Sequence, residues 1–258
     1  MLLWRNRISI RICVILAAPN LDLLNDPRWR AKGNQSPSGT RRLVGKKLYV
    51  WGTGGHAKSL AEIAMASGFQ IQAFISPNSD YQTFLGFNAY PNLPEGLAPT
   101  NAVIAIGIGD NFTRQKVWIE LNRTYPISMF PPLIHPTASI AKNSEIGQGS
   151  TIHQNSIVGT SSQVGIFCTL NTASSLDHDC ILGNFASLGP GARTGGNVTV
   201  GERAVLAISS TTRHGVQIGE DSVLGAASYA HKSIPPLTIA VGAPASFLKD
   251  RKAHDPYL

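Results

Sequence analysis

A six-residue repeat of apolar residues runs through the second half of the sequence. Counting in sixes from Ile140 to Leu224, thirteen of fifteen positions hold an aliphatic residue, and the phase is never interrupted. The residue two places before each of them is small or Val, and Gly follows directly in nine of the fifteen cases. Hexad repeats are typical of a parallel β-helix, in which three hexads make one triangular coil. The pattern predicts such a helix over residues 134–230, with no long loop between Ile140 and Leu224.

The chemistry of each hexad fits this geometry. A large aliphatic residue fills the interior of the prism, and a small residue fits beside it where the space narrows. We attribute Gly, Asn and Asp at the corners to left-handed backbone angles, which these residues tolerate best. A β-sandwich would instead show strands every 8–12 residues with strict alternation. Cys168 and Cys180 occupy small interior positions, which predicts buried filling side chains and not nucleophiles.

Residues 47–133 show a different pattern, with short apolar runs separated by helical stretches. Strands are expected at Leu48–Gly52, Ile71–Ile75 and Val103–Gly107. A glycine turn opens a helix that ends at Gly68, and a second helix is expected over Asn111–Arg123. Phe112, Val117 and Leu121 should form the buried side of that second helix. Strand, glycine turn, helix and strand predict a small Rossmann-like parallel sheet, so the fold class is α/β followed by an all-β parallel β-helix.

The two chain ends differ from these domains. Residues 1–47 hold ten Lys or Arg and two Asp or Glu, whereas the remaining residues carry a net charge of −1. We interpret residues 1–46 as a basic, disordered extension of a cytoplasmic protein, with an organelle-targeting peptide as the alternative. Basic residues do not cluster in the folded part, so we expect no nucleic-acid partner. The longest apolar run, Ile12–Ala18, is too short for a transmembrane segment. Residues 231–258 should cap the β-helix.

Four motifs together resemble a known family. They are GTGGHA at Gly52–Ala57, the segment Ile106–Asn111, LNTASSLDHDC at Leu170–Cys180, and VGAPA at Val241–Ala245. The combination resembles the left-handed β-helix sugar O/N-acetyltransferases, which include sialic-acid O-acetyltransferases and nucleotide amino-sugar N-acetyltransferases. The resemblance implies a homotrimer with acetyl-CoA bound between neighbouring prisms, a UDP-linked amino sugar as acceptor, and no metal.

The resemblance also implies roles for individual residues. His178 matches the general base, and Asp179 matches the acid that orients it. Ser187 stands where the family often has a second histidine, which leaves oxyanion stabilisation unassigned. The residues expected to contact acetyl-CoA are Asn171, Ser187, Gly191, Gly196, Ala226, Lys232, Gly242 and Pro244, with Lys249 as a further phosphate ligand. Those expected to contact the nucleotide sugar are Gly52, Gly54, Gly55, His56, Gly107 and Asn111.

Three alternatives stay open at this point. The first is O-acetylation of a sialic acid or another sugar hydroxyl. The second is a γ-type carbonic anhydrase, which the histidine spacing disfavours. His214 follows His178 by two coils, roughly 10 Å, which is too far for one metal ion. The third is a non-catalytic scaffold, which the Asp-His-Asp sequence at Asp177–Asp179 disfavours.

Overall fold

The computed structural model describes residues 46–77 and 82–256, all of which belong to one structural unit. The predicted basic extension, its targeting alternative and Cys13 lie outside the described residues. Within the described ranges, no helix combines the length and the apolar character needed to cross a bilayer.

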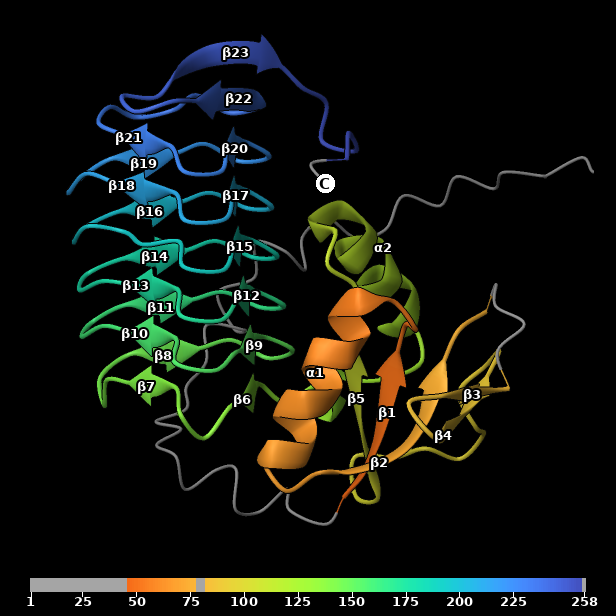
Figure 1. Ribbon diagram of the computed structural model, residues 1–258. Coiled ribbons are helices and arrows are strands. Elements are labelled where there is room, and N and C mark those ends of the chain that lie inside the picture. Colours follow the sequence, from red (N-terminus) through yellow and green to blue (C-terminus); the bar gives the residue numbers. More distant parts are fainter. Residues whose placement is uncertain (1–45, 78–81, 257–258) are drawn as a thin grey trace, which may run out of the picture. The chain divides into compact units, whose positions relative to one another are not determined.

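The first part of the described chain is the predicted α/β unit (Figure 1). Its elements are β1 (Lys47–Trp51), α1 (Gly55–Ala66), β2 (Gln70–Ile75), β3 (Thr83–Phe84), β4 (Phe87–Tyr90), β5 (Ala102–Ile106), α2 (Asn111–Leu121) and a 3-10 helix (Ile127–Met129). The sheet order is β3-β4-β2-β1-β5, with β4, β2, β1 and β5 parallel and β3 antiparallel. The three predicted strands are confirmed, and the hairpin of β3 and β4 is an addition that the sequence reading missed.

The second part, drawn in green to blue in Figure 1, is a parallel β-helix of two-residue strands that ends in two longer strands, β22 and β23. Its strands are β6 (Leu133–Ile134), β7 (Ser139–Ile140), β8 (Glu145–Ile146), β9 (Thr151–Ile152), β10 (Ile157–Val158), β11 (Gln163–Val164), β12 (Thr169–Leu170), β13 (Ser175–Leu176), β14 (Ile181–Leu182), β15 (Ser187–Leu188), β16 (Thr199–Val200), β17 (Val205–Leu206), β18 (Thr211–Thr212), β19 (Gln217–Ile218), β20 (Val223–Leu224), β21 (Tyr229–Ala230), β22 (Thr238–Val241) and β23 (Ser246–Asp250). The predicted fold class is confirmed.

The strands stack with the predicted spacing. Ile152 pairs with Leu170, and Leu170 with Leu188, so positions 18 apart lie above one another. We name the sheet of β6, β9, β12, β15, β17, β20 and β22 the groove sheet. The antiparallel strand β23 pairs with β22 at its end. The predicted aliphatic residues form one core inside the prism, together with the fully buried, free thiols of Cys168 and Cys180.

The corner glycines have a different cause from the one we expected. Gly147, Gly159 and Gly183 directly follow interior aliphatic residues, and none of them has a positive φ. A Cβ on Gly147 would lie 2.4 Å from the backbone of Gly165 in the next coil. These glycines are therefore required because successive coils approach closely. The residue with left-handed backbone angles comes two places after such a glycine. This position accepts large side chains, such as Phe167 at φ 52°.

The inner face of α2 is largely polar, so the predicted apolar side was right at Leu121 and wrong at Phe112 and Val117. Its buried residues are Asn111, Arg114, Gln115, Trp118 and Leu121, whereas Phe112 and Val117 are only half-buried. The reason is that α2 packs along a corner of the β-helix, where backbone carbonyls and charged side chains point outwards.

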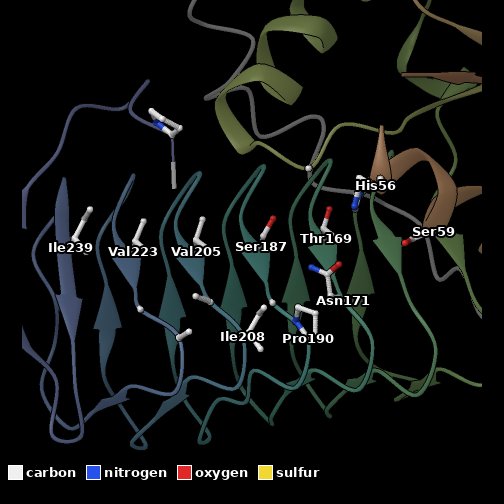
Figure 2. A pocket seen from close by; sticks show the side chains of 17 residues that line it. His56, Ser59, Thr169, Asn171, Ser187, Pro190, Val205, Ile208, Val223 and Ile239 are labelled. Carbon is white, nitrogen blue, oxygen red and sulfur yellow. The ribbon is translucent and has the colours of Figure 1, made fainter. Parts of the chain in front are cut away.

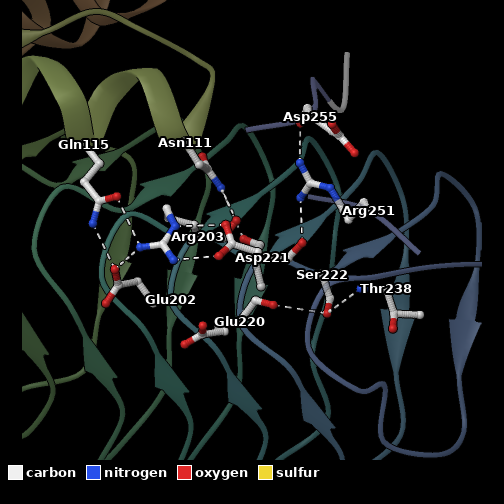
Figure 3. A network of polar contacts seen from close by, with 11 residues as sticks. Asn111, Gln115, Glu202, Arg203, Glu220, Asp221, Ser222, Thr238, Arg251 and Asp255 are labelled. Atoms are coloured by element: carbon white, nitrogen blue, oxygen red, sulfur yellow. Dashed lines mark hydrogen bonds and ion pairs between the residues drawn. The ribbon is translucent and has the colours of Figure 1, made fainter. Parts of the chain in front are cut away.

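Side-chain contacts join this helix to the β-helix (Figure 3). Arg203 forms a bidentate pair with Asp221, at 2.9 and 2.6 Å, and also donates to Gln115. Gln115 in turn donates to Glu202. On the same corner, nearer the first coils, the centres of the Trp118 and Phe167 rings are 4.6 Å apart. These contacts fix the α/β unit against the coils that carry the site.

Candidate active site

A groove of about 700 Å³ runs along the groove sheet beside the start of α1 (Figure 2). Its lining residues are Gly55, His56, Ser59, Gly109, Thr169, Asn171, Ser187, Gly189, Pro190, Val205, Ala207, Ile208, Val223, Gly225, Ala226, Ile239 and Pro256. The lining residues recur along the groove because the strands of the groove sheet stack in register. Outward residues of the groove sheet form one wall, and the residues that follow β12, β15, β17 and β20 form the next.

We name the residues that directly follow the strands β6, β9, β12, β15, β17 and β20 the corner column. They are His135, His153, Asn171, Gly189, Ala207 and Gly225. Each is 18 residues from the next, so they stack along one edge of the prism. Three of these six residues, Gly189, Ala207 and Gly225, are small, and they lie beside the apolar side chains of Val205 and Val223.

The groove is therefore chemically divided. One stretch, along Val205, Val223 and Ile239, is apolar, which suits a long flexible chain. The other end presents polar groups, namely Thr169, Asn171, Ser187, His56 and Ser59 (Figure 2). A ligand with an apolar arm and a polar reactive end would match both stretches.

The polar end also receives the N-terminus of α1. The cap residue Gly54 offers no side-chain hydrogen bond, and the first turn contains no acidic residue. A Cβ on Gly54 or Gly55 would meet nothing within 4 Å, so the approach to the helix end is open. Free backbone N–H groups and the helix dipole both favour an anion such as a phosphate there.

Two of the glycines predicted to contact substrate have a packing role. A Cβ on Gly52 would lie 2.9 Å from the carbonyl oxygen of Gly107. A Cβ on Gly107 would lie 2.9 Å from Ala57 in α1. Neither residue lines the groove. The close approach of β1, β5 and α1 explains both.

Asn111 and Ser187 meet at the buried side of the groove. The Ser187 hydroxyl donates to Asn111 Oδ1 at 2.7 Å, and Asn111 Nδ2 donates to the Arg203 carbonyl oxygen at 3.0 Å. Asn111 is 2% exposed and does not line the groove, so it lies behind the site and not within it. The Ser187 hydroxyl, a candidate thioester ligand by sequence, is engaged in this network.

Arg114 organises the same region and was not found by sequence reasoning. Its guanidinium donates to the carbonyl oxygens of Phe167, Phe185, Ile108 and Gly109 at 2.8–2.9 Å. It also donates to Asn111 Oδ1 at 2.7 Å. Arg114 gives no sequence signal, because its acceptors are mainly backbone carbonyls, two of them just before α2 and two in distant coils.

The predicted base and its partner lie at another corner. His178 Nδ1 is 2.8 Å from Asp179 Oδ2, and the Asp177 carboxylate accepts from the His178 backbone N–H. The hydrogen bond to Asp179 raises the pKa of His178 above its usual value. The His178 side chain is 48% exposed, which leaves Nε2 accessible. The corner of Asn171 precedes β13 and the corner of His178 follows it, so the groove and His178 lie at opposite ends of that strand.

Gly196 lies under the His178 ring, one coil away. A Cβ there would be 2.3 Å from Nε2, so only Gly allows the ring its position. This changes the expected separation of His178 and His214, whose ring centres are 6.3 Å apart because no side chain stands between them. Within the described residues no group of three His, Cys, Asp or Glu is arranged to hold a metal ion.

The predicted cofactor residues divide into two sets. Asn171, Ser187 and Ala226 line the groove. Gly191, Gly196, Lys232, Gly242 and Pro244 are not among its lining residues. The groove residues Thr169, Ala207 and Ile208 were missed. The 18-residue spacing of the corner column would have found Ala207, since it follows Asn171 by two coils.

Comparisons with known proteins agree with this architecture. Residues 47–121 match the family described as the PglD N-terminal domain. A comparison with curated protein sequences gives no significant match. One similar structure is the acetyltransferase domain of PglB from Neisseria gonorrhoeae, with 30% identity and a TM-score of 0.72. The match covers 79% of this chain and 100% of that one. That domain is also solved in complex with acetyl coenzyme A.

A second similar structure is the GDP-perosamine N-acetyltransferase of Caulobacter crescentus, solved with CoA and GDP-perosamine. It is 28% identical, with a TM-score of 0.70, and the match covers 79% of this chain and 97% of that one. Both relatives span the α/β unit and the β-helix. With this identity and coverage, the chain belongs to the hexapeptide-repeat sugar acetyltransferases.

Proposed function

We propose that the protein transfers the acetyl group of acetyl-CoA to the amino group of a nucleotide-linked amino sugar. The observation that carries the proposal is the divided groove. Its apolar stretch, lined by the small residues Gly189, Ala207 and Gly225, suits the pantetheine arm. The polar end lies beside an uncapped helix N-terminus, which suits the diphosphate of a nucleotide sugar. The thioester and the amine would meet between them.

His178 is the proposed general base. An amine that attacks a thioester must lose a proton, and a histidine with a free Nε2 can take it. Asp179 holds Nδ1 at 2.8 Å, so it fixes the tautomer and stabilises the imidazolium that forms. Uracil is the proposed nucleotide base, and the GDP-linked ligand of the Caulobacter relative makes guanine the alternative to test against it.

His178 and the groove of the same chain lie at opposite ends of β13, so the proposed site needs a second copy. In a closed threefold assembly, His178 of one copy reaches the polar end of its neighbour's groove. The exposed side chains of Ile157 and Ile181, each 47% exposed, are apolar surface that such an assembly would cover.

Subunit complementation tests the shared site. Ala207→Phe blocks the groove, and His178→Ala removes the base, so each variant alone should be inactive. When the two are refolded together in equal amounts, about a quarter of the sites should combine an open groove with an intact His178 and regain activity. Refolding either variant alone is the control. Mixed assemblies that stay inactive would refute the shared site.

The substrate class is tested by turnover. Acetyl-CoA consumption is measured with UDP- and GDP-linked amino sugars, the free amino sugars and sialic acid. We expect turnover with a nucleotide-linked amino sugar and a much lower kcat/KM for the free sugar, which lacks the diphosphate. Turnover of sialic acid alone would replace this proposal by O-acetylation.

A further inference from the structure

Two histidines lie next to each other near the polar end of the groove, and only one of them was singled out by sequence motifs. His56 follows the glycine turn at the start of α1 and lines the groove. His153 follows β9 in the corner column, one coil from Asn171. The ring centres of His56 and His153 are 5.6 Å apart. They come from the α/β unit and from the β-helix, respectively.

Each of the two imidazole rings has a nitrogen without a hydrogen-bond partner among the described residues. Nε2 of His56 and Nε2 of His153 are both buried and have no hydrogen-bond partner among the residues that the structure describes. His153 is only 2% exposed. Buried polar atoms without a partner are rare in native proteins because each one is costly, so two such nitrogens on adjacent rings beside a groove call for a ligand.

Both rings are neutral at physiological pH. Burial, followed by the charge of His135, lowers the pKa of His153 to about 4. Burial, followed by the charges of Arg114 and His153, lowers the pKa of His56 to about 3. Groups this weakly basic are poor proton acceptors, so neither competes with His178 as the general base. A neutral imidazole has one donor and one acceptor nitrogen, which makes it suited to binding an uncharged polar group.

We propose that His153 and His56 together bind one hydroxyl group of the acceptor sugar. The proposal rests on the function proposed above, and it adds the group that holds the sugar in place. A hydroxyl can donate to one imidazole and accept from the other. An oxygen about 2.9 Å from both nitrogens lies about 4 Å from each ring centre, which a 5.6 Å separation of the centres permits. Ligand access requires the His56 ring to turn, and this ring already borders the groove.

The test compares His153→Leu with a matched control in the same column. His135 lies one coil away, is half-buried, and has its Nδ1 hydrogen-bonded to Thr137, so His135→Leu should leave kinetics unchanged. His153→Leu should lower kcat/KM for the nucleotide sugar by about 10- to 100-fold and leave KM for acetyl-CoA unchanged. His153→Gln, which keeps a polar group near the Nε2 position, should recover part of the loss.

Two further measurements separate binding from a structural role. The free His153→Leu variant should be as thermostable as wild type or more so, because an unsatisfied buried nitrogen is removed. A panel of substrate analogues, each lacking one sugar hydroxyl, identifies the group that is bound. For one analogue, kcat/KM with the wild-type enzyme should be low, and His153→Leu should not lower it further.

The outcomes are distinct. If wild type acetylates a nucleotide-linked amino sugar and His153→Leu matches it in kcat/KM, this inference is wrong and the proposed function stands. A loss of kcat/KM that is accompanied by a lowered melting temperature, and that is equal for every deoxy analogue, would assign His153 a structural role and also overturn the inference. If wild type acetylates no nucleotide-linked amino sugar, the proposed function fails and the inference fails with it.

Discussion

Replacing Gly196 by Ala should disable the proposed base without disturbing the fold. A Cβ at this position would lie 2.3 Å from His178 Nε2 and 2.4 Å from Cε1. Ordinary carbon contacts begin near 3.4 Å, so the ring must move by about 1 Å. The obstacle is the end of a half-exposed side chain and not backbone, and Gly196 has no positive φ, so the backbone accepts Ala.

The expected magnitude follows from that displacement. Misplacing a reacting group by about 1 Å can cost about 100-fold in rate, which corresponds to about 2.7 kcal/mol at the transition state. The loss should appear in kcat, because the base acts on the acceptor amine. KM for acetyl-CoA should stay near the wild-type value, because Gly196 does not line the groove.

Steady-state kinetics with a saturating nucleotide amino sugar measures this. The control is a double-mutant cycle with His178→Ala, which alone should cost about 10²–10⁴-fold. If Gly196→Ala acts only by moving the ring, adding it to His178→Ala should cost nothing further. An unchanged kcat would refute the reasoning. A raised KM for acetyl-CoA with kcat intact would restore Gly196 to the cofactor groove, as the sequence first indicated.

Two further predictions concern the charged groups. Asp179→Asn should move the rising limb of the pH–rate profile to lower pH, because Asp179 raises the pKa of His178 and the imidazole deprotonates earlier without it; the maximal rate should fall as well, and an unshifted limb would mean that His178 is not the titrating base. Arg114→Met should lower the free energy of unfolding by about 3 kcal/mol or more, because it strands several buried carbonyls. Chemical denaturation measures this against Arg123→Met, which removes an exposed pair with Glu120 and should cost less than about 1 kcal/mol.

The β-helix could be predicted from sequence because its interactions repeat at a fixed distance along the chain. An interior residue such as Leu170 contacts positions 18 before and after it, so a local pattern contains the long-range pairing. The same regularity placed Asn171 at a corner. It did not reveal why Gly follows the aliphatic residue, because that depends on how closely two coils approach, which spacing alone does not state.

The contact between the two parts could not be predicted in this way. Apolar periodicity assigned α2 a buried side containing Phe112 and Val117, but the buried side contains Arg114 and Gln115. An apolar rule fails there because the surface opposite α2 is a row of carbonyls and charges, including the Phe167 and Phe185 carbonyl oxygens. His153 was missed for a related reason, since only its proximity to His56 gives it a chemical context.

The histidines of the proposed site lie in two kinds of environment, which shift their pKa values in opposite directions. His178 is exposed beside a carboxylate, which raises its pKa and makes it a competent proton acceptor. His56 and His153 are enclosed where the α/β unit meets the β-helix, and burial lowers the pKa of each far below neutrality. Opposite shifts among neighbouring titratable groups commonly separate groups that move protons from groups that do not. A base becomes charged when it takes the proton, which solvent and a carboxylate stabilise, whereas a neutral binding group gains strength from being enclosed. The same fold therefore places the proposed base on an open corner and the proposed sugar-binding pair at a closed one, and in the mechanism that we propose a second copy of the chain brings them together.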